Sequence, residues 1–276
     1  MQKRATGAQA GGRIDPALIE QRTDAIVVLT LNRPQARNSL SEAMLAALQA
    51  AIDRISADRG VRAAVIAAKG PAFSAGHDMK EMTARRSDAD RGQAYFRELM
   101  DRCSLMMQSI VRSPKPFIAA VEGVATAAGC QLVATCDLAV AGVDARFATP
   151  GVNIGLFCST PMVALSRNVP RKRAMEMLLL GEMLPAQDAA SFGLVNRVVP
   201  RGRALAEAML MAAAIAAKSP ATVAVGKETF YRQLEAPLAQ AYRDAAETMA
   251  RNMMFRDAKE GIGAFIEKRE PQWKGC

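Results

Sequence analysis

The stretch from Pro116 to Val140 reads PFIAAVEGVATAAGCQLVATCDLAV. Its apolar run, Phe117 to Val121, lies between a proline and a Glu-Gly pair, which predicts a short strand buried on both faces. The small residues Thr126 to Gln131 then lead into a second apolar segment, which predicts a loop entering a helix. A helix N-terminus carries unpaired backbone N–H groups and a partial positive charge, and small side chains let a ligand approach them. On its own, the stretch fits an oxyanion site and a tightly packed structural helix equally well.

A second stretch, Gly70 to Met82, reads GPAFSAGHDMKEM and has the same character. It follows the apolar run Ala63 to Ala68 and passes through small residues to a predicted helix start at Asp78. Two such turns, each presenting one backbone N–H, can converge on one carbonyl oxygen and form an oxyanion hole. The second stretch therefore favours the ligand-binding interpretation over simple packing.

Together these motifs resemble the crotonase superfamily, also called the enoyl-CoA hydratase/isomerase family. The resembling segments run in order along nearly the whole chain: LTLNRPQARNSLSEAML, FSAGHDMKEM, AAVEGVATAAGCQL, DLAVAGVDARFATPGVNIGL, AQDAASFGLVNRVV and FIEKREPQW. The resemblance implies an α/β fold, a crotonase (ClpP-like) spiral of β-β-α turns followed by a helical C-terminal trimerisation region. It also implies a homotrimer or a dimer of trimers that acts on acyl-CoA thioesters. No cofactor or metal is expected, since coenzyme A enters as part of the substrate.

The resemblance assigns the backbone N–H groups of His77 and Ala128 to the oxygen of a thioester enolate. Typical hydratases of this family manage the added water with two glutamates, and the aligned positions here hold Gln131 and Gly151. Neither residue can act as an acid or base, because glutamine does not titrate in the useful range and glycine has no side chain. We therefore expect an acyl-CoA lyase scaffold with weak or no hydratase activity. Decarboxylation, thioester hydrolysis and acyl-CoA binding without catalysis stay open as alternatives.

Further contacts with substrate or CoA are implied by the resemblance in four parts of the chain. The residues are Gln35, Ala36 and Arg37; Ala75, Gly76, Asp78 and Met79; Gly151 and Cys158; and Phe265 and Lys268. Relatives present an aromatic residue and a lysine at the last two positions, commonly from a neighbouring subunit. The Gln131 amide can position a water or the thioester. The His77 side chain can pack or move a proton, and the Cys158 thiol is a candidate nucleophile.

The composition narrows the class of protein. The chain has 276 residues, of which 50% are hydrophobic and 23% charged, and no apolar run approaches the roughly 20 residues of a membrane span. The net charge of +9 favours an anionic partner such as CoA, whereas scattered basic residues and 5% aromatics argue against nucleic acid. Five cysteines without a CxxC pattern indicate reduced thiols in an intracellular protein. A single histidine argues against a zinc site or a Ser-His-Asp triad.

The pattern along the chain predicts three parts. Residues 1–23 lack the apolar core of a secretory signal and are expected to be a disordered tail, in a bacterial cytoplasmic protein or, in a eukaryote, a mitochondrial matrix protein. Residues 24–200 alternate strand and helix patterns and form the spiral core. Residues 201–276 contain only helical patterns and form the oligomerisation region. A single helix is predicted over Arg167 to Leu180.

Overall fold

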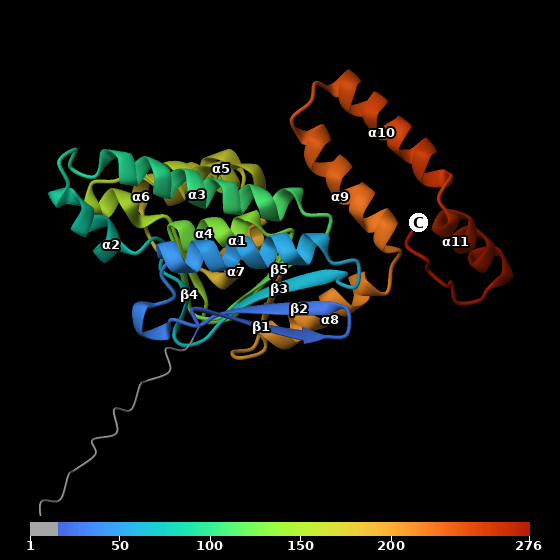
Figure 1. Ribbon diagram of the computed structural model, residues 1–276, viewed down its shortest axis with the longest axis horizontal. Coiled ribbons are helices and arrows are strands. Elements are labelled where there is room, and N and C mark those ends of the chain that lie inside the picture. Colours follow the sequence, from blue (N-terminus) through green and yellow to red (C-terminus); the bar gives the residue numbers. More distant parts are fainter. Residues whose placement is uncertain (1–15) are drawn as a thin grey trace, which may run out of the picture.

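The computed structural model describes residues 16–276 and contains two sheets surrounded by helices (Figure 1). The larger sheet has the strand order β1-β2-β3-β5-β7-β10 and the smaller one β4-β6-β8-β9. The strands are β1 Leu18–Thr23, β2 Ile26–Leu31, β3 Ala63–Ala68, β4 Ala72–Ser74, β5 Phe117–Val121, β6 Val124–Thr126, β7 Leu138–Gly142, β8 Arg146–Ala148, β9 Leu184–Pro185 and β10 Arg197–Val199. From β3 to β8 the chain alternates between the two sheets, which produces the predicted β-β-α spiral.

Helices cover both sheets and continue beyond them. The α-helices are α1 Glu42–Ala57, α2 Met79–Ala84, α3 Gln93–Arg112, α4 Ala128–Thr135, α5 Ser159–Asn168, α6 Arg171–Leu180, α7 Ala186–Ser191, α8 Ala204–Ala216, α9 Pro220–Leu234, α10 Leu238–Met253 and α11 Arg256–Glu267. The short 3-10 helices are η1 Pro34–Ala36, η2 Arg85–Ser87 and η3 Pro150–Ile154. Helix α1 is capped by Ser41, whose hydroxyl accepts a hydrogen bond from the N–H of Met44.

The segment that decided the prediction lies at the centre of the larger sheet. Strand β5 is buried along its whole length and pairs in parallel with β3 on one side and β7 on the other. Its residues are apolar throughout because a central parallel strand is covered on both faces. The predicted loop and helix follow as β6 and the fully buried α4.

The tail predicted over residues 1–23 is wrong at its C-terminal end. Residues 18–23 form β1, which pairs antiparallel with β2 from Leu18 opposite Leu31 to Thr23 opposite Ile26. The sequence LIEQRT is mostly polar because β1 is an edge strand with exposed side chains, so it gave no buried-strand pattern. Residues 1–15 lie outside the described residues.

Two helix predictions also need correction. The helix predicted over Arg167 to Leu180 is two helices, since Pro170 forces Val169 into an extended conformation between α5 and α6. The boundary predicted at residue 201 places α8 in the oligomerisation region. Helix α8 instead buries Ala204, Ala208 and Ala212 against the larger sheet, so it belongs to the core.

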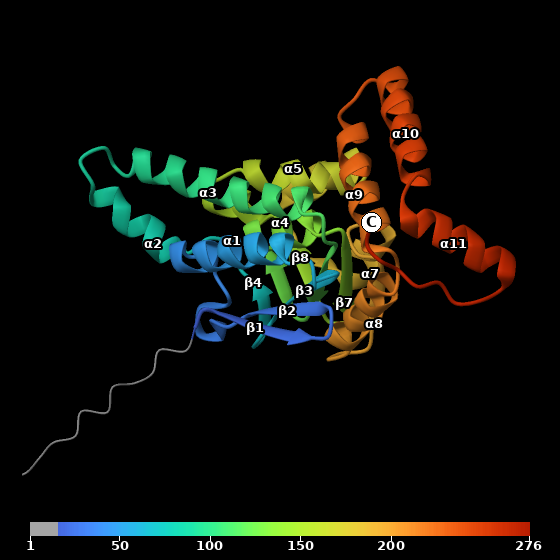
Figure 2. The same ribbon diagram turned by 45° about the vertical axis from the view of Figure 1, so that its right-hand side comes forward.

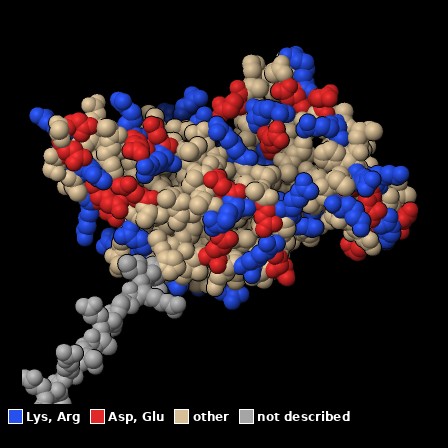
Figure 3. Space-filling model, viewed as in Figure 1, with Lys and Arg blue, Asp and Glu red and all other residues tan. Residues whose placement is uncertain are grey.

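The last three helices project from the core as an arm, which we define as α9 to α11 (Figures 1 and 2). Its surface carries large exposed apolar side chains, including Phe230, Leu234, Leu238, Tyr242, Met249, Met254, Phe265 and Ile266. On the face shown in Figure 3, basic and acidic side chains are interspersed. Within residues 16–276 no single helix is long and apolar enough to cross a membrane, although α8 and α9 pass that test together as a pair bent by 107°.

Candidate functional site

Three parallel strands of the smaller sheet end at the same edge. Strands β4 and β6 pair in parallel, and so do β6 and β8. The carboxyl ends of parallel strands point the same way, so the segments that follow them meet at one edge of the sheet. These segments contain residues 75–78, 127–131 and 149–151, and all three hold predicted site residues.

The first two segments touch at Gly76. A Cβ atom on Gly76 would lie 2.9 Å from the Cβ of Ala127 and 3.1 Å from the backbone nitrogen of Ala128. Gly76 also has a φ of 89°, so both its backbone conformation and its surroundings require glycine. The sequence FSAGHD therefore places His77 directly beside the start of α4.

The N–H groups of His77 and Ala128 are both free to donate. Ala128 is the first residue of α4, where backbone N–H groups have no intrahelical partner. Within residues 16–276 neither N–H donates a hydrogen bond to a backbone carbonyl. The preceding residue, Ala127, has φ 49° and ψ −120°, and its own N–H is bonded to the carbonyl of Ala148 at 2.9 Å. This strained residue fixes the direction of the Ala128 N–H.

Gln131 and Gly151, the two residues predicted to stand in place of the family's glutamates, lie in different surroundings. Gln131, in the first turn of α4, is 5% exposed, and its Oε1 is buried without a hydrogen-bond partner in the described chain. At Gly151, a Cβ atom would lie 2.7 Å from the carbonyl oxygen of Leu156 and 2.9 Å from the Cys158 sulfur. The space that a side chain at position 151 would need is therefore already filled.

The Cys158 thiol is poorly suited to nucleophilic attack. Burial raises the pKa of Cys158, and its contact with the Gly151 backbone only partly opposes that shift. The group is consequently protonated near neutral pH, whereas the thiolate is the nucleophilic form. Its position against Gly151 indicates that it fills space beside the site.

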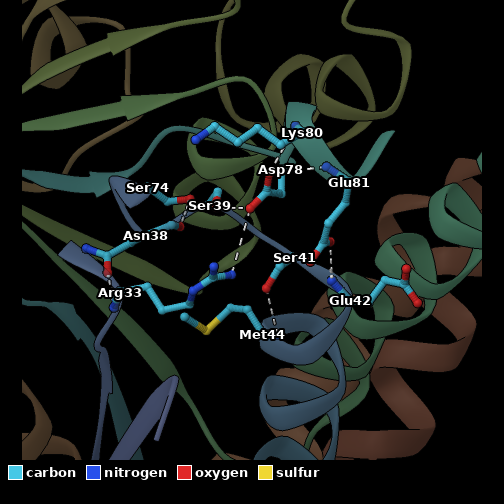
Figure 4. Close-up of polar contacts among 10 residues, drawn as sticks. All are labelled: Arg33, Asn38, Ser39, Ser41, Glu42, Met44, Ser74, Asp78, Lys80 and Glu81. Atoms are coloured by element: carbon cyan, nitrogen blue, oxygen red, sulfur yellow. Dashed lines mark hydrogen bonds and ion pairs between the residues drawn. The ribbon is translucent and has the colours of Figure 1, made fainter. Parts of the chain in front are cut away.

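Asp78 has a structural role rather than a free carboxylate. Figure 4 shows its side chain capping α2, where it accepts hydrogen bonds from the N–H groups of Lys80 and Glu81. It also accepts one from the Ser39 hydroxyl at 3.0 Å and lies 3.8 Å from the Arg33 guanidinium. Burial raises the pKa of Asp78, but these partners outweigh it and lower the pKa overall. Met79, the next predicted contact, is 45% exposed at the start of α2.

An open groove of about 760 Å³ runs beside η1 and α2. Its walls include Gln35 and Arg33 from the η1 region, together with Ala43 of α1 and Glu81 of α2. The structure thus brings Gln35 to a cavity. Ala36 and Arg37 end the same short helix without lining the groove, and the Arg37 carbonyl accepts a hydrogen bond from the N–H of Ala75.

Phe265 and Lys268 do not join this site within one chain. Phe265 is 84% exposed on α11, and Lys268 follows at the C-terminal cap of that helix. Both views place α11 at the opposite end of the molecule from α2 (Figures 1 and 2).

Thr149 is a buried polar residue at the site that the sequence did not reveal. It follows β8 directly and is completely buried, and its hydroxyl oxygen has no hydrogen-bond partner within residues 16–276. Its position after a three-residue strand is visible only once β6 and β8 are paired.

The His77 imidazole is neutral at physiological pH. Burial lowers its pKa from 6.5 to about 4, and its Nε2 atom is buried without a partner in the described chain. Between these two values the unfolded chain binds a proton that the folded chain does not. Stability therefore rises with pH across this window and is lost as the pH falls toward 4.

We expect urea denaturation to give a free energy of unfolding roughly 2 kcal/mol lower at about pH 5 than at about pH 7.5, because of His77 alone. The sequence contains one histidine, so a His77→Gln variant removes the whole histidine contribution. Carboxylates titrate in both proteins and cancel in the comparison. Equal pH dependence in wild type and variant would show that the imidazole is not desolvated.

Known proteins resemble this chain over most of its length. The enoyl-CoA hydratase/isomerase family matches residues 21–276. The chain belongs to this family. Mouse enoyl-CoA hydratase domain-containing protein 3, a mitochondrial protein, is 48% identical over 96% of the chain and 87% of its own length. A putative enoyl-CoA hydratase of Thermus thermophilus is 38% identical over 90% of the chain and 97% of its own length.

Solved structures of the enoyl-CoA hydratase/isomerase family also match. The enoyl-CoA hydratase of Mycobacterium smegmatis has a TM-score of 0.89 and 55% identity, over 94% of this chain and 99% of that one. Human enoyl-CoA hydratase domain-containing protein 3 has a TM-score of 0.88 and 47% identity, over 93% of this chain and 100% of that one. The predicted crotonase fold with a helical C-terminal region is confirmed.

Proposed function

We propose that the chain binds acyl-CoA thioesters and stabilises their enolate form with the backbone N–H groups of His77 and Ala128. The observation that carries the proposal is the close approach of Gly76 to Ala128, whose nitrogen lies 3.1 Å from the position of a Gly76 Cβ. This approach brings together two N–H donors that have no backbone acceptor within residues 16–276. Fixed N–H donors stabilise the negative charge of an enolate oxygen without reorganising during the reaction. The groove lined by Gln35 and Arg33 supports a CoA site next to η1.

The proposed chemistry includes weak or no hydration of enoyl-CoA. Gln131 offers no titratable group, Gly151 has no side chain, and the neutral His77 has a pKa of about 4. Water addition needs a base for the water and an acid for the α-carbon. A reaction that forms the enolate without adding water does not need this acid and base. Binding without catalysis needs neither group.

The direct test is mass-spectrometric turnover of an acyl-CoA panel, including crotonyl-, malonyl- and methylmalonyl-CoA, with thermal shifts recorded alongside. Consumption of one thioester would identify the reaction. Thermal shifts without consumption would identify an acyl-CoA-binding protein. The absence of both thioester consumption and thermal shifts would contradict the proposal.

We also propose a homotrimer or dimer of trimers, in which Phe265 and Lys268 reach the CoA site of a neighbouring subunit. The exposed apolar side chains of the arm, and the distance of α11 from α2 in one chain, support this assembly (Figure 2). Sedimentation velocity should give a mass of three or six chains. A monomer would contradict it. We propose cytoplasmic localisation in a bacterium and matrix localisation in a eukaryote.

Gly76→Ala should abolish acyl-CoA binding and lower the free energy of unfolding by about 1–3 kcal/mol. The added methyl group would lie 3.1 Å from the Ala128 nitrogen and so displace one of the two donors. Gly202→Ala is the matched control, because Gly202 has a similar φ of 76° but no atom within 4 Å of its Cβ position. Calorimetric titration with butyryl-CoA and urea denaturation measure the two effects. Equal binding by both variants would show that the Gly76 contact does not shape the site.

A further inference from the structure

The chain beyond α11 turns back and packs where the arm joins the core. We define residues 269–276 as the strap, which follows α11 and returns to the first turn of α9 (Figures 1 and 2). A Cβ atom on Gly275 would lie 3.3 Å from the Cγ of Pro220, the first residue of α9. The strap itself contains neither helix nor strand. Its position therefore depends on hydrogen bonds to the arm and to the end of α8.

The Asp257 carboxylate anchors the strap to α11 and α9. It is 1% exposed and accepts hydrogen bonds from the N–H groups of Lys274 and Gly275 at 2.7 and 2.9 Å. It accepts a third, at 2.6 Å, from the hydroxyl of Ser219, which caps α9 by accepting the N–H of Thr222. Three donors replace the hydration that a buried carboxylate loses. Burial raises the pKa of Asp257, but these donors outweigh it and lower the pKa overall, so the group is ionised near neutral pH.

Trp273 connects the middle of the strap to the junction between α8 and α9. Its Nε1 donates a hydrogen bond to the carbonyl of Ala217 at 2.8 Å. Arg62, which precedes β3 in the core, donates to the neighbouring carbonyl of Ala216, also at 2.8 Å. Carbonyls at the end of a helix have no intrahelical partner, so the strap and the core each satisfy one of them. The axes of α8 and α9 differ by 107° at this junction, and both bonds help to fix that bend.

The beginning of the strap fixes the chain next to Lys268. Lys268 ends α11 in a left-handed conformation with a φ of 55°. The guanidinium of Arg269 then donates two hydrogen bonds to Glu260 of α11, at 2.6 and 3.1 Å. The same carboxylate accepts the N–H of Gln272 at 2.8 Å. An exposed ion pair alone contributes little to stability, but this one is combined with a backbone hydrogen bond of the strap. The strap thus fixes the turn that carries Lys268.

We propose that the strap, anchored by Asp257, positions Phe265 and Lys268 for contact with the CoA bound to a neighbouring subunit. Phe265 is 84% exposed, so its location follows that of α11 as a whole. Asp257 and Trp273 are then positioning residues, because they act on α11 and its junction with the core. The inference rests on the proposed function, which assigns Phe265 and Lys268 to that contact. A strap that only stabilises the fold is the competing interpretation.

The test releases the strap in the full chain with Asp257→Asn. The amide cannot accept all three hydrogen bonds, because its NH₂ group only donates. The sequence contains one tryptophan, so the fluorescence of Trp273 reports whether the strap stays docked. We expect red-shifted emission and, in calorimetric titration, at least about tenfold weaker binding of butyryl-CoA. Red-shifted emission with wild-type affinity would show that the strap only stabilises the fold, and unchanged emission would show that Asp257 does not anchor it. Either result overturns the inference.

Lys268→Ala distinguishes positioning from stability. Alone, it should weaken butyryl-CoA binding by a similar factor. Added to Asp257→Asn, it should cost less than about twofold more, because the released strap has already displaced the lysine. Losses that multiply would show that Asp257 does not act through Lys268, which overturns the inference. Unchanged affinity in Lys268→Ala contradicts the CoA contact and the inference with it. Absence of butyryl-CoA binding by the wild type contradicts the proposed function itself.

Gly261→Val releases the strap from its other side and keeps the test decisive if Asp257→Asn does not fold. Its Cβ atom would lie 3.0 Å from the Trp273 ring. Gly263→Val is the matched control on the same helix. Outside the helix backbone, the nearest described atom to its Cβ position belongs to the Arg269 guanidinium, 4.0 Å away. The control should keep wild-type emission and affinity, whereas Gly261→Val should lose both. Equal butyryl-CoA affinity in the two valine variants would overturn the inference.

Discussion

Crotonyl-CoA hydration by this chain is expected to be about 10²–10⁴-fold slower than by a family hydratase that carries both glutamates. That range is the usual contribution of a positioned acid or base, and Gln131 and Gly151 supply neither. Loss of the enoyl-thioester absorbance, followed side by side with such a hydratase, measures the difference. Wild-type rates within tenfold of that enzyme would contradict the proposed function.

Introducing carboxylates at positions 131 and 151 should not produce a fast hydratase. Gln131→Glu places an acid in the first turn of α4, where the helix dipole favours negative charge. Gly151→Glu fails for steric reasons, because its Cβ would lie 2.7 Å from the Leu156 carbonyl oxygen and 2.9 Å from the Cys158 sulfur. Only the sulfur can be removed by mutation, so Cys158→Ala relieves half of the conflict.

The expected results are a folded but slow Gln131→Glu variant and a Gly151→Glu variant that melts at a markedly lower temperature. Gly226→Glu on α9 is the control, since Gly226, like Gly151, has no positive φ, and no atom lies within 4 Å of its Cβ position. It tests the cost of an added glutamate without the collision. A stable Gln131→Glu, Gly151→Glu double variant with rapid hydration would show that the segment from η3 to α5 moves to accept the glutamate.

Much of the site's framework could be predicted from the sequence because it depends on local signals. The run FIAAV predicted the central strand β5, and small residues after it predicted the start of α4. The small residues of FSAGHD predicted a second turn that can converge with the first. The arrangement of these segments followed from the family resemblance and was confirmed by the fold.

Other features depend on contacts that no local pattern records. Strands β4, β6 and β8 have three residues each, too few to show periodicity, so Thr149 could not be placed at the site. Cys158 fills the space beside Gly151, and this contact joins residues on two different turns. The sequence predicts a helix start at Asp78, but not that the Ser39 hydroxyl and the Arg33 guanidinium lie beside its carboxylate.

Lys227→Met should lower the free energy of unfolding by about 3–5 kcal/mol. Lys227 is 6% exposed in its side chain, and its Nζ lies 2.7 Å from the Asp137 carboxylate. The same nitrogen donates to the carbonyls of Ile110 and Lys115, both at 2.9 Å. Burial lowers the pKa of Lys227, and the nearby Asp137 carboxylate opposes that shift. The positive charge of Lys227 therefore depends on Asp137. Removing it would leave a buried carboxylate without its cation.

Loss of the Lys227 amino group should also weaken the attachment of the arm, because Lys227 lies on α9 and its acceptors belong to the core. Asp137 keeps two other donors, the Tyr231 hydroxyl at 2.9 Å and the Phe117 N–H at 2.7 Å. Adding Asp137→Asn to Lys227→Met removes the unpaired charge, so the double variant should be more stable than the single one.

Arg232→Met is the matched control on the same helix. Arg232 pairs with Glu228 at 3.4 Å, but the two side chains are 47% and 66% exposed, and such pairs contribute about 0–1 kcal/mol. Urea denaturation measures all three variants, and sedimentation velocity reports whether the assembly survives. If Lys227→Met costs no more than Arg232→Met, the buried pair does not hold the arm. A large loss confined to Lys227→Met would show that the arm's orientation, and with it any site completed by a neighbouring chain, depends on one buried ion pair.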